Sequence, residues 1–234
     1  AKSVYMARTR LPEVCMLGYT ELQLDSATSM LMGLLNGYAT VRHEACTGSD
    51  IFELFASAGI EVHEDIHNYR NETEAVAAAT ALTRNGHKLF WPYPLPAELY
   101  PQASHLVAPE LYRRLNAKQH LSDLVPAEHL AWQQCLSHAQ LASVTAQQPL
   151  CLKAGGNAAT GWGYAVFPCR NADELDFARQ WFAEHQASVP LVLAEQWLDI
   201  DCSWCVGLAI SETGTRSFGG AEQLFSSPCK QSGS

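Results

Sequence analysis

Helical and extended patterns alternate along the first hundred residues, and this alternation restricts the possible folds more than any other feature of the chain. Residues 26–35 carry Leu, Met and Ala at helical spacing and are predicted as a helix. Residues 51–57 are predicted as a helix that Ser49-Asp50 can cap, and residues 74–84 as a helix that Asn71 or Thr73 can cap. Residues 60–62 and 88–91 are predicted as short strands. Because helices and strands alternate, we expect a parallel α/β domain.

Prolines gather between residues 92 and 101, and the aromatic residues among them indicate an ordered connector. We place the domain boundary at Ser104, which gives an N-terminal α/β domain over residues 1–104 and a second domain over residues 105–234. The second domain is predicted to contain helices, a strand–turn–strand hairpin and further strands. The predicted helices span residues 109–120, 126–137 and 174–185, and the predicted strands span residues 150–153, 164–167, 191–195, 203–210 and 217–225.

The charge of the chain excludes some classes of partner. Acidic residues outnumber Lys and Arg, and the formal net charge is −9. The cations are scattered, so no basic stripe could follow a nucleic-acid backbone, and we expect no nucleic-acid partner. No run of about eighteen uncharged apolar residues is present, and no leader pattern opens the chain, so we expect a soluble, cytoplasmic protein without a membrane partner. The eight cysteines are dispersed, which indicates reduced thiols.

A glycine-rich segment joins the two strands of the predicted hairpin. It follows Lys153 and contains, in order, Gly155, Gly156, Asn157, Thr160, Gly161 and Gly163. Glycines let the backbone approach a ligand closely and point successive N–H groups at an anion, so we expect this segment to cover the phosphates of a nucleotide. The flanking elements are strands and no Gly-Lys-Ser/Thr opens a helix, so the segment is neither a Walker loop nor a dinucleotide fingerprint. The alternative is an ordinary glycine-rich turn.

Two lysines accompany this segment. Lys153 ends the strand that leads into the glycines, where its ammonium group could reach phosphate oxygens, and Lys118 lies upstream in the helix predicted over residues 109–120. The alternative for each lysine is a solvated surface position. Downstream, the strand predicted over residues 191–195 runs into a polar turn that could offer backbone groups to an adenine edge.

The order of these parts resembles the ATP-grasp superfamily, over roughly residues 108–234. Members of that superfamily place one lysine before the central subdomain, a second on the strand before a glycine-rich flap, and a glutamate on a later hinge strand. The resemblance implies an α/β protein in which a parallel α/β domain precedes an ATP-grasp α+β domain. It also implies that Lys118 and Lys153 contact the α- and β-phosphates of ATP and that the glycine segment covers them. The remaining implied contacts are those of Glu195, Gln196, Trp197 and Leu198 with adenine, and of Asp201 or Asp199 with the ribose.

The resemblance further implies ATP and Mg²⁺ as cofactors and an ATP-dependent ligase as the activity. In such ligases a small carboxylate substrate becomes an acyl phosphate, and an amine or a thiol then displaces phosphate. The family's metal ligands lie on late strands that have no counterpart up to Ser234, so we expect an incomplete ATP-grasp domain that lacks the C-terminal metal-binding part. A truncated chain, a partner chain that supplies the missing half and a non-catalytic nucleotide-binding subunit or regulator all fit this expectation. The sequence identifies no catalytic residue and no metal ligand, and it leaves a homo-oligomer open.

Two other motifs suggest different chemistry. The run His63-Glu64-Asp65-Ile66-His67 satisfies His-Glu-x-x-His, whose histidines bind zinc from one helix face, so a zinc hydrolase is an alternative function. Solvated loop histidines are the simpler interpretation, because the preceding residues are predicted as a strand. Cys202 and Cys205 have the spacing of a redox pair but do not open a helix after a strand, which favours two ordinary thiols.

Overall fold

A computed structural model describes residues 2–6, 17–91, 95–145, 147–156, 164–227 and 230–233. The chain forms two compact units, Ala1–Ala117 and Lys118–Ser234. The boundary therefore lies after the one predicted at Ser104, because the segment that follows Ser104 packs on the first unit. The Leu106 amide donates to the Leu89 carbonyl over 2.8 Å, and the rings of Trp91 and Tyr112 lie 6.4 Å apart.

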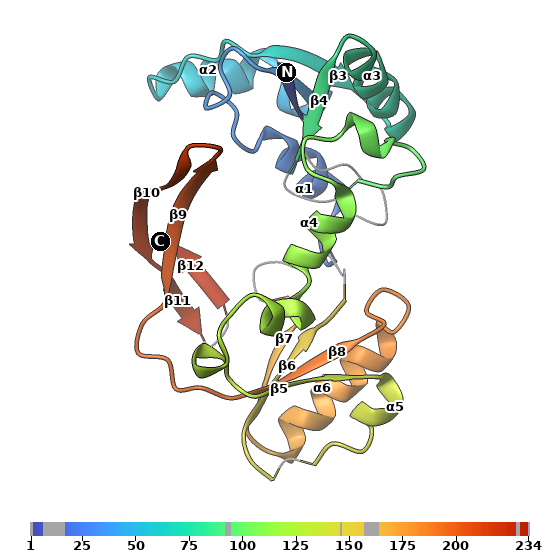
Figure 1. The fold of residues 1–234 in the computed structure, drawn as a ribbon, viewed down its shortest axis with the longest axis vertical. Helices are drawn as coiled ribbons and strands as arrows, with labels where there is room; N and C mark the ends of the chain where they lie inside the picture. The colour runs from blue at the N-terminus through green and yellow to red at the C-terminus, as the bar shows by residue number, and fades with distance from the viewer. Residues whose placement is uncertain are drawn as a thin grey trace. The chain divides into compact units, whose positions relative to one another are not determined.

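The first unit is built on a parallel four-stranded sheet in the order β3-β2-β1-β4 (Figure 1). Its strands are β1 (Lys2–Met6), β2 (Ala39–His43), β3 (Asp65–Tyr69) and β4 (His87–Phe90). The expected parallel α/β domain is confirmed. β1 and β2 were not predicted as strands, although β2 is buried at all five positions and β1 places Val4, Tyr5 and Met6 in the core.

In the described part of the first unit, four α-helices and three 3₁₀ helices connect and follow these strands. They are α1 (Glu21–Ser26), Ala27–Ser29, Glu44–Cys46, α2 (Ser49–Ser57), α3 (Glu72–Arg84), Gln102–Ser104 and α4 (Pro109–Asn116). The capping interpretation of α3 is confirmed, because the Asn71 side chain accepts the Glu74 amide hydrogen at 3.0 Å. Ala75, Ala79 and Leu82 then point into the core.

The helix predicted over residues 26–35 is wrong. α1 ends at Ser26 and gives way to a 3₁₀ turn, after which Leu31 takes a left-handed conformation with φ 63°. The guanidinium of Arg42 donates to the carbonyls of Thr28 and Met30, which holds this stretch as a loop on β2. A tertiary contact therefore overrides the helical spacing of the sequence.

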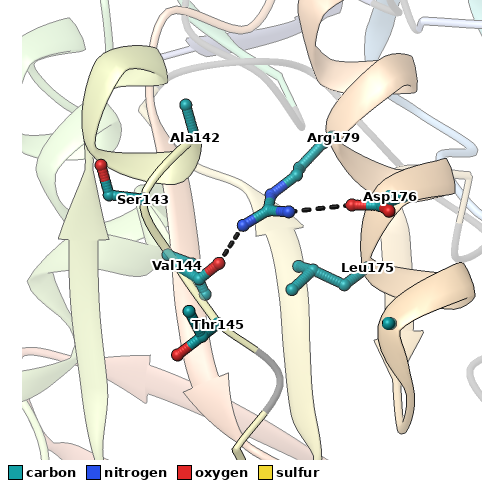
Figure 2. A pocket seen from close by; sticks show the side chains of 8 residues that line it. Ala142, Ser143, Val144, Thr145, Leu175, Asp176 and Arg179 are labelled. Carbon is teal, nitrogen blue, oxygen red and sulfur yellow. Dashed lines mark hydrogen bonds and ion pairs between the residues drawn. The ribbon is translucent and has the colours of Figure 1, made fainter.

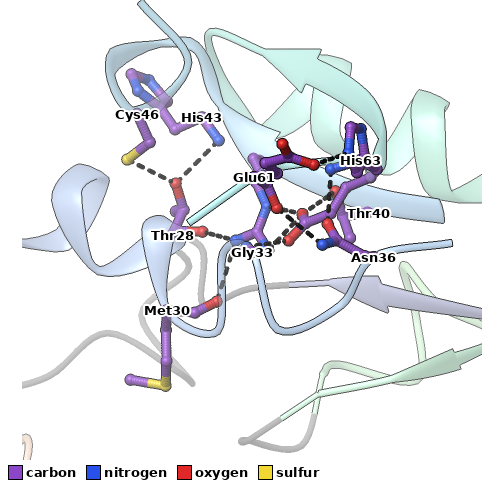
Figure 3. Close-up of polar contacts among 11 residues, drawn as sticks. Thr28, Met30, Gly33, Asn36, Thr40, His43, Cys46, Glu61 and His63 are labelled. Atoms are coloured by element: carbon purple, nitrogen blue, oxygen red, sulfur yellow. Dashed lines mark hydrogen bonds and ion pairs between the residues drawn. The ribbon is translucent and has the colours of Figure 1, made fainter. Parts of the chain in front are cut away.

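The strand predicted over residues 60–62 is also wrong, because the strand begins at Asp65. The Asn36 side chain takes the hydrogen bonds that a neighbouring strand would take: its amide nitrogen donates to the Glu61 carbonyl at 2.8 Å, and its oxygen accepts from the His63 amide at 2.6 Å (Figure 3). The segment is thereby fixed as a loop, and β3 pairs with β2 only beyond it.

The second unit contains an antiparallel four-stranded sheet in the order β5-β8-β6-β7. The strands are β5 (Gln133–Leu136), β6 (Leu150–Ala154), β7 (Val166–Cys169) and β8 (Val192–Gln196), and the unit's helices are 3₁₀ Lys118–Asp123, 3₁₀ Ala127–His129, α5 (His138–Leu141) and α6 (Ala172–Glu184). The predicted hairpin of β6 and β7 is confirmed. The helix predicted over residues 126–137 is wrong, since only Ala127–His129 turns and β5 instead pairs with β8.

Helix α6 covers one face of this sheet. It buries Leu175, Ala178 and Phe182, and the ring of Phe167 on β7 lies 5.3 Å from that of Phe182. Leu152 pairs with Phe167 and so lies on the same face. Lys153, one residue on, lies on the opposite face, where α6 does not reach.

Two further hairpins complete the described part of the chain. They consist of β9 (Trp204–Ser211) with β10 (Gly214–Glu222), and β11 (Leu224–Ser227) with β12 (Lys230–Gly233). The two strands of the first hairpin were predicted, as residues 203–210 and 217–225. Among the described residues, no helix is long and apolar enough to cross a membrane.

Candidate functional site

Strand register places Lys153 beside Glu195 on the sheet face opposite α6. Lys153 of β6 pairs with Leu193 of β8, and Glu195 pairs with Cys151, so the two charged residues are diagonal neighbours on one face. Their side chains form an ion pair between Nζ and Oε2. The Lys153 side chain is 28% exposed and the Glu195 side chain 16%, so the pair is only partly screened by solvent.

Lys118 joins this pair from another element. The predicted helix over residues 109–120 ends at Asn116, because Ala117 adopts an extended conformation with ψ 117°, and Lys118 then begins a 3₁₀ helix. Burial lowers the pKa of Lys118, the positive charge of Lys153 lowers it further, and the carboxylate of Glu195 opposes both effects. The two lysines of the sequence prediction are therefore close enough for their charges to interact.

This arrangement favours an anion. The ammonium group of Lys153 pairs with the Glu195 carboxylate, the charge of Lys118 interacts with both, and all three side chains are partly withdrawn from water. A negatively charged ligand would relieve the repulsion between Lys118 and Lys153, and its attraction to them is stronger at this site than in bulk solvent. Lysines act on phosphates as such point charges.

The chain continues after β6 with Gly155 and Gly156, whose amides both donate to acceptors within the protein. The Gly155 amide donates to the Leu191 carbonyl at 2.9 Å, and a Cβ at Gly155 would lie 3.2 Å from that same oxygen, so the close approach favours glycine. Gly156 has φ +68°, a conformation that favours glycine. Both glycines are thus explained by geometry. The other predicted residues of the segment, Asn157, Thr160, Gly161 and Gly163, lie outside the described residues.

The predicted adenine and ribose residues lie in and after β8. Gln196 pairs with Leu150, so its side chain lies on the face opposite Glu195, and its amide donates to the Trp132 carbonyl at 2.9 Å. The Trp197 amide approaches the Pro149 carbonyl at 3.4 Å. Leu198 and Asp201 are exposed in the segment that follows. The structure therefore brings together Lys118, Lys153, Glu195, Gly155 and Gly156, and nothing ties Asp201 to them.

One residue of this cluster was missed from the sequence. Gln119, next to Lys118, accepts a hydrogen bond from the Gly156 amide through Oε1 at 2.9 Å. A single glutamine after a lysine carries no recognisable pattern, so only the fold reveals this contact.

A cavity of about 410 Å³ lies elsewhere, against α6 and the loop after α5 (Figure 2). Arg179 contributes a cationic side chain to it, and its guanidinium donates to the Val144 carbonyl and to the Asp176 carboxylate, the latter at 2.8 Å. The bond to Val144 joins α6 to the loop, whereas the bond to Asp176 lies within α6, so Arg179 has a structural role. None of the predicted site residues lines this cavity, and the ammonium cluster is the stronger candidate on chemical grounds.

The zinc-hydrolase alternative is wrong. The Glu64 side chain is fully buried and accepts from the Gly33 amide at 2.8 Å, Thr40 Oγ1 at 3.1 Å and Arg42 Nε at 2.8 Å, so it holds the loop at Gly33 and is not free to act as a base. His63 lies in a loop and His67 on β3, not on one helix face. In the described part of the chain, no group of three His, Cys, Asp or Glu residues could hold a metal.

Comparison with known proteins gives two kinds of match. Residues 1–113 match a family model described as the L-aspartate–L-methionine ligase N-terminal domain. The solved structure of an N5-carboxyaminoimidazole ribonucleotide synthetase in complex with ADP aligns with 95% of this chain and 54% of its own, with 16% identity and a TM-score of 0.58.

The corresponding synthase from Aspergillus clavatus, in complex with ATP, aligns with 98% of this chain and 56% of its own at 15% identity, with a TM-score of 0.57. The synthetase from Staphylococcus aureus, in complex with ADP, aligns with 98% of this chain and 56% of its own at 13% identity, with a TM-score of 0.56. This chain therefore shares the fold of these synthetases. The match supports the predicted order of a parallel α/β domain followed by an ATP-grasp α+β domain. The chain spans about half the length of the ATP-grasp structures that it matches.

Proposed function

We propose that this chain carries the nucleotide-binding part of an ATP-dependent ligase that joins a carboxylate to an amine. The observation that carries the proposal is the ion pair of Lys153 and Glu195 on the sheet face opposite α6, with Lys118 close enough for its charge to interact with both. Three ATP-grasp structures that share the fold are described as complexes with ADP or ATP. The family model that matches residues 1–113 is named for a ligase of two amino acids, which supports amino acids as the substrate class.

The cluster fits the phosphates of a nucleotide. In the proposed complex, Lys118 and Lys153 contact the α- and β-phosphates, and the backbone at Gly155 and Gly156 brings the glycine segment over them. Glu195, which pairs with Lys153, also accepts a hydrogen bond from adenine, and the backbone of residues 196–198 provides further hydrogen bonds to the base. Asp201 is proposed to bind the ribose.

Magnesium is proposed as a cofactor from the superfamily resemblance alone. The described residues offer no set of three ligands for it. We therefore assign no step to a metal on this chain, and the residues of the cluster act by binding and orienting the nucleotide.

In the proposed reaction, an oxygen of the substrate carboxylate attacks the γ-phosphorus of ATP, and ADP leaves. The amine of the second substrate then attacks the carbonyl carbon of the acyl phosphate, and inorganic phosphate leaves while the amine loses its proton. Positioning and charge stabilisation account for most of the acceleration in such transfers. Lys118 and Lys153 would contribute by holding the phosphates as charge moves to the leaving ADP.

Isothermal titration with ATP, compared across three variants of the full chain, tests this proposal. Lys118→Met and Lys153→Met each remove one charge-assisted contact, and we expect ATP affinity to fall by about 10- to 100-fold in each. Lys2→Met, at an exposed position in the first unit, is the matched control and should bind as the wild type does. Unchanged affinity in both cluster variants would refute the proposed site.

A further inference from the structure

Gln119 connects the two elements that carry the lysines. It lies in the 3₁₀ helix Lys118–Asp123, and its Oε1 accepts a hydrogen bond from the Gly156 amide, three residues after Lys153, at 2.9 Å. Gln119 is half-buried, and so is Gly156. The bond therefore lies in a partly shielded setting, where a hydrogen bond is stronger than at the open surface.

The Gly156 bond differs from those of the preceding residues. The Ala154 amide donates to the Ala165 carbonyl at 3.0 Å, and the Gly155 amide donates to the Leu191 carbonyl at 2.9 Å. Both of these acceptors belong to the backbone, whereas the Gly156 amide donates to a side chain. A substitution at Gln119 therefore removes the acceptor of the Gly156 amide and leaves the backbone bonds of Ala154 and Gly155 in place.

The charges on either side of this bond repel each other. Burial lowers the pKa of Lys118, the positive charge of Lys153 lowers it further, and the Glu195 carboxylate opposes both effects, so the bond of Gln119 to Gly156 joins two elements whose ammonium groups exert a repulsive force on each other. A neutral amide can oppose that force without neutralising either ammonium group. A carboxylate at the same position would compete with phosphates for them.

We propose that Gln119 is a positioning residue: by accepting the Gly156 amide hydrogen, it keeps Lys118 next to Lys153 so that both ammonium groups meet the phosphates of one nucleotide. This role rests on the proposed function. Gln119 acts on the ligand through Lys118 and the end of β6, and it has no assigned contact with the base. Its removal should therefore affect the phosphate part of the ligand and leave the adenosine part unchanged.

Gln119→Met tests this role, because methionine keeps the length of the side chain and removes the acceptor. Gln180→Met is the matched control, since Gln180 forms an exposed bond to Glu184 within α6. Titrations with ATP and with adenosine would be compared for both variants and the wild type. We expect ATP to bind about five- to tenfold more weakly to Gln119→Met, in line with one hydrogen bond, and adenosine to bind as before.

Amide hydrogen exchange by NMR gives a second readout that needs no ligand. The Gly156 amide should exchange faster in Gln119→Met, while the Gly155 amide, bonded to Leu191, keeps its rate. Gln119→Glu keeps an acceptor and should preserve Gly156 protection, yet bind ATP more weakly than the wild type because of its charge.

The outcomes separate the two proposals. Wild-type chain that binds neither ATP nor adenosine refutes the nucleotide site itself, and the role of Gln119 with it. Wild-type chain that binds ATP, combined with unchanged ATP affinity or unchanged Gly156 exchange in Gln119→Met, overturns the role of Gln119 alone. Equal weakening of ATP and adenosine also overturns it, since a general structural defect would do the same.

Discussion

Replacing Glu64 by glutamine tests the interpretation of the His-Glu-x-x-His run as a structural element. Glu64 and Arg42 have side chains with 0% exposure, and Arg42 Nη2 lies 2.7 Å from Glu64 Oε2. Glu64 also accepts from the Gly33 amide and from Thr40 Oγ1. In Glu64→Gln the volume is kept and the charge is lost, which leaves a buried guanidinium without its counter-ion.

Removing one partner of a buried ion pair costs about 3–5 kcal/mol. Glutamine retains a carbonyl oxygen that could still accept one of these bonds, so we expect the lower end, about 3 kcal/mol. This corresponds to a fold-change of roughly a hundred in the opening equilibrium of the first unit.

Hydrogen exchange followed by mass spectrometry is the suitable assay, because a two-unit chain need not unfold in a single step. Peptides that cover β2 and β3 should lose protection in Glu64→Gln, while peptides from β6 and β8 keep theirs. Glu61→Gln is the control, since Glu61 lies three residues away with an 83% exposed side chain that pairs with His63. A loss in Glu64→Gln no larger than in the control would refute the reasoning.

Two further predictions concern pH. Because the pKa of Lys118 is lowered, Lys118 loses its charge at a lower pH than an ordinary lysine does, and ATP affinity should fall as the pH rises toward this pKa. ATP titrations over the alkaline pH range should show this fall in the wild type. In Lys118→Arg the fall should be absent, because arginine stays charged. Burial lowers the pKa of His105 to about 4 from 6.5, with Arg113 and Lys88 adding to the effect and Glu110 opposing it. The unfolded chain therefore binds the proton first, and stability present above pH 6.5 should fall by about 3 kcal/mol as pH drops from 6.5 to about 4. Denaturant unfolding at several pH values checks this, and an equally steep acid loss in His105→Gln would contradict the assignment to His105.

Parts of the fold follow from local chemistry and could be predicted. The Asn71 cap and the Asn171 cap each begin a helix where the sequence indicated one, because a side-chain oxygen satisfies an amide that the helix leaves free. The hairpin of β9 and β10 turns where Glu212, Thr213 and Gly214 interrupt an extended pattern. In these cases the determining contacts lie within a few residues.

Other parts depend on contacts between distant residues. Residues 26–35 have helical spacing, yet the guanidinium of Arg42 binds their carbonyls, and residues 126–137 have helical spacing, yet β5 pairs with β8 some sixty residues later. The residues of the site also fall into those that the sequence could indicate and one that it could not. Lys118, Lys153 and Glu195 could be singled out by type and order, whereas Gln119 is defined only by where the Gly156 amide lies.

The position of β1 has a consequence for synthesis on the ribosome. β1 lies between β2 and β4 in the sheet, with Lys2 opposite His87, so β1 acquires its second neighbour only after β4 has been synthesised. Both pairings are parallel and long in sequence separation, which makes them slow to form. The nascent first unit therefore exposes an open, apolar strand edge for most of its own translation, and a chaperone that shields such edges is expected to raise the yield of folded chain.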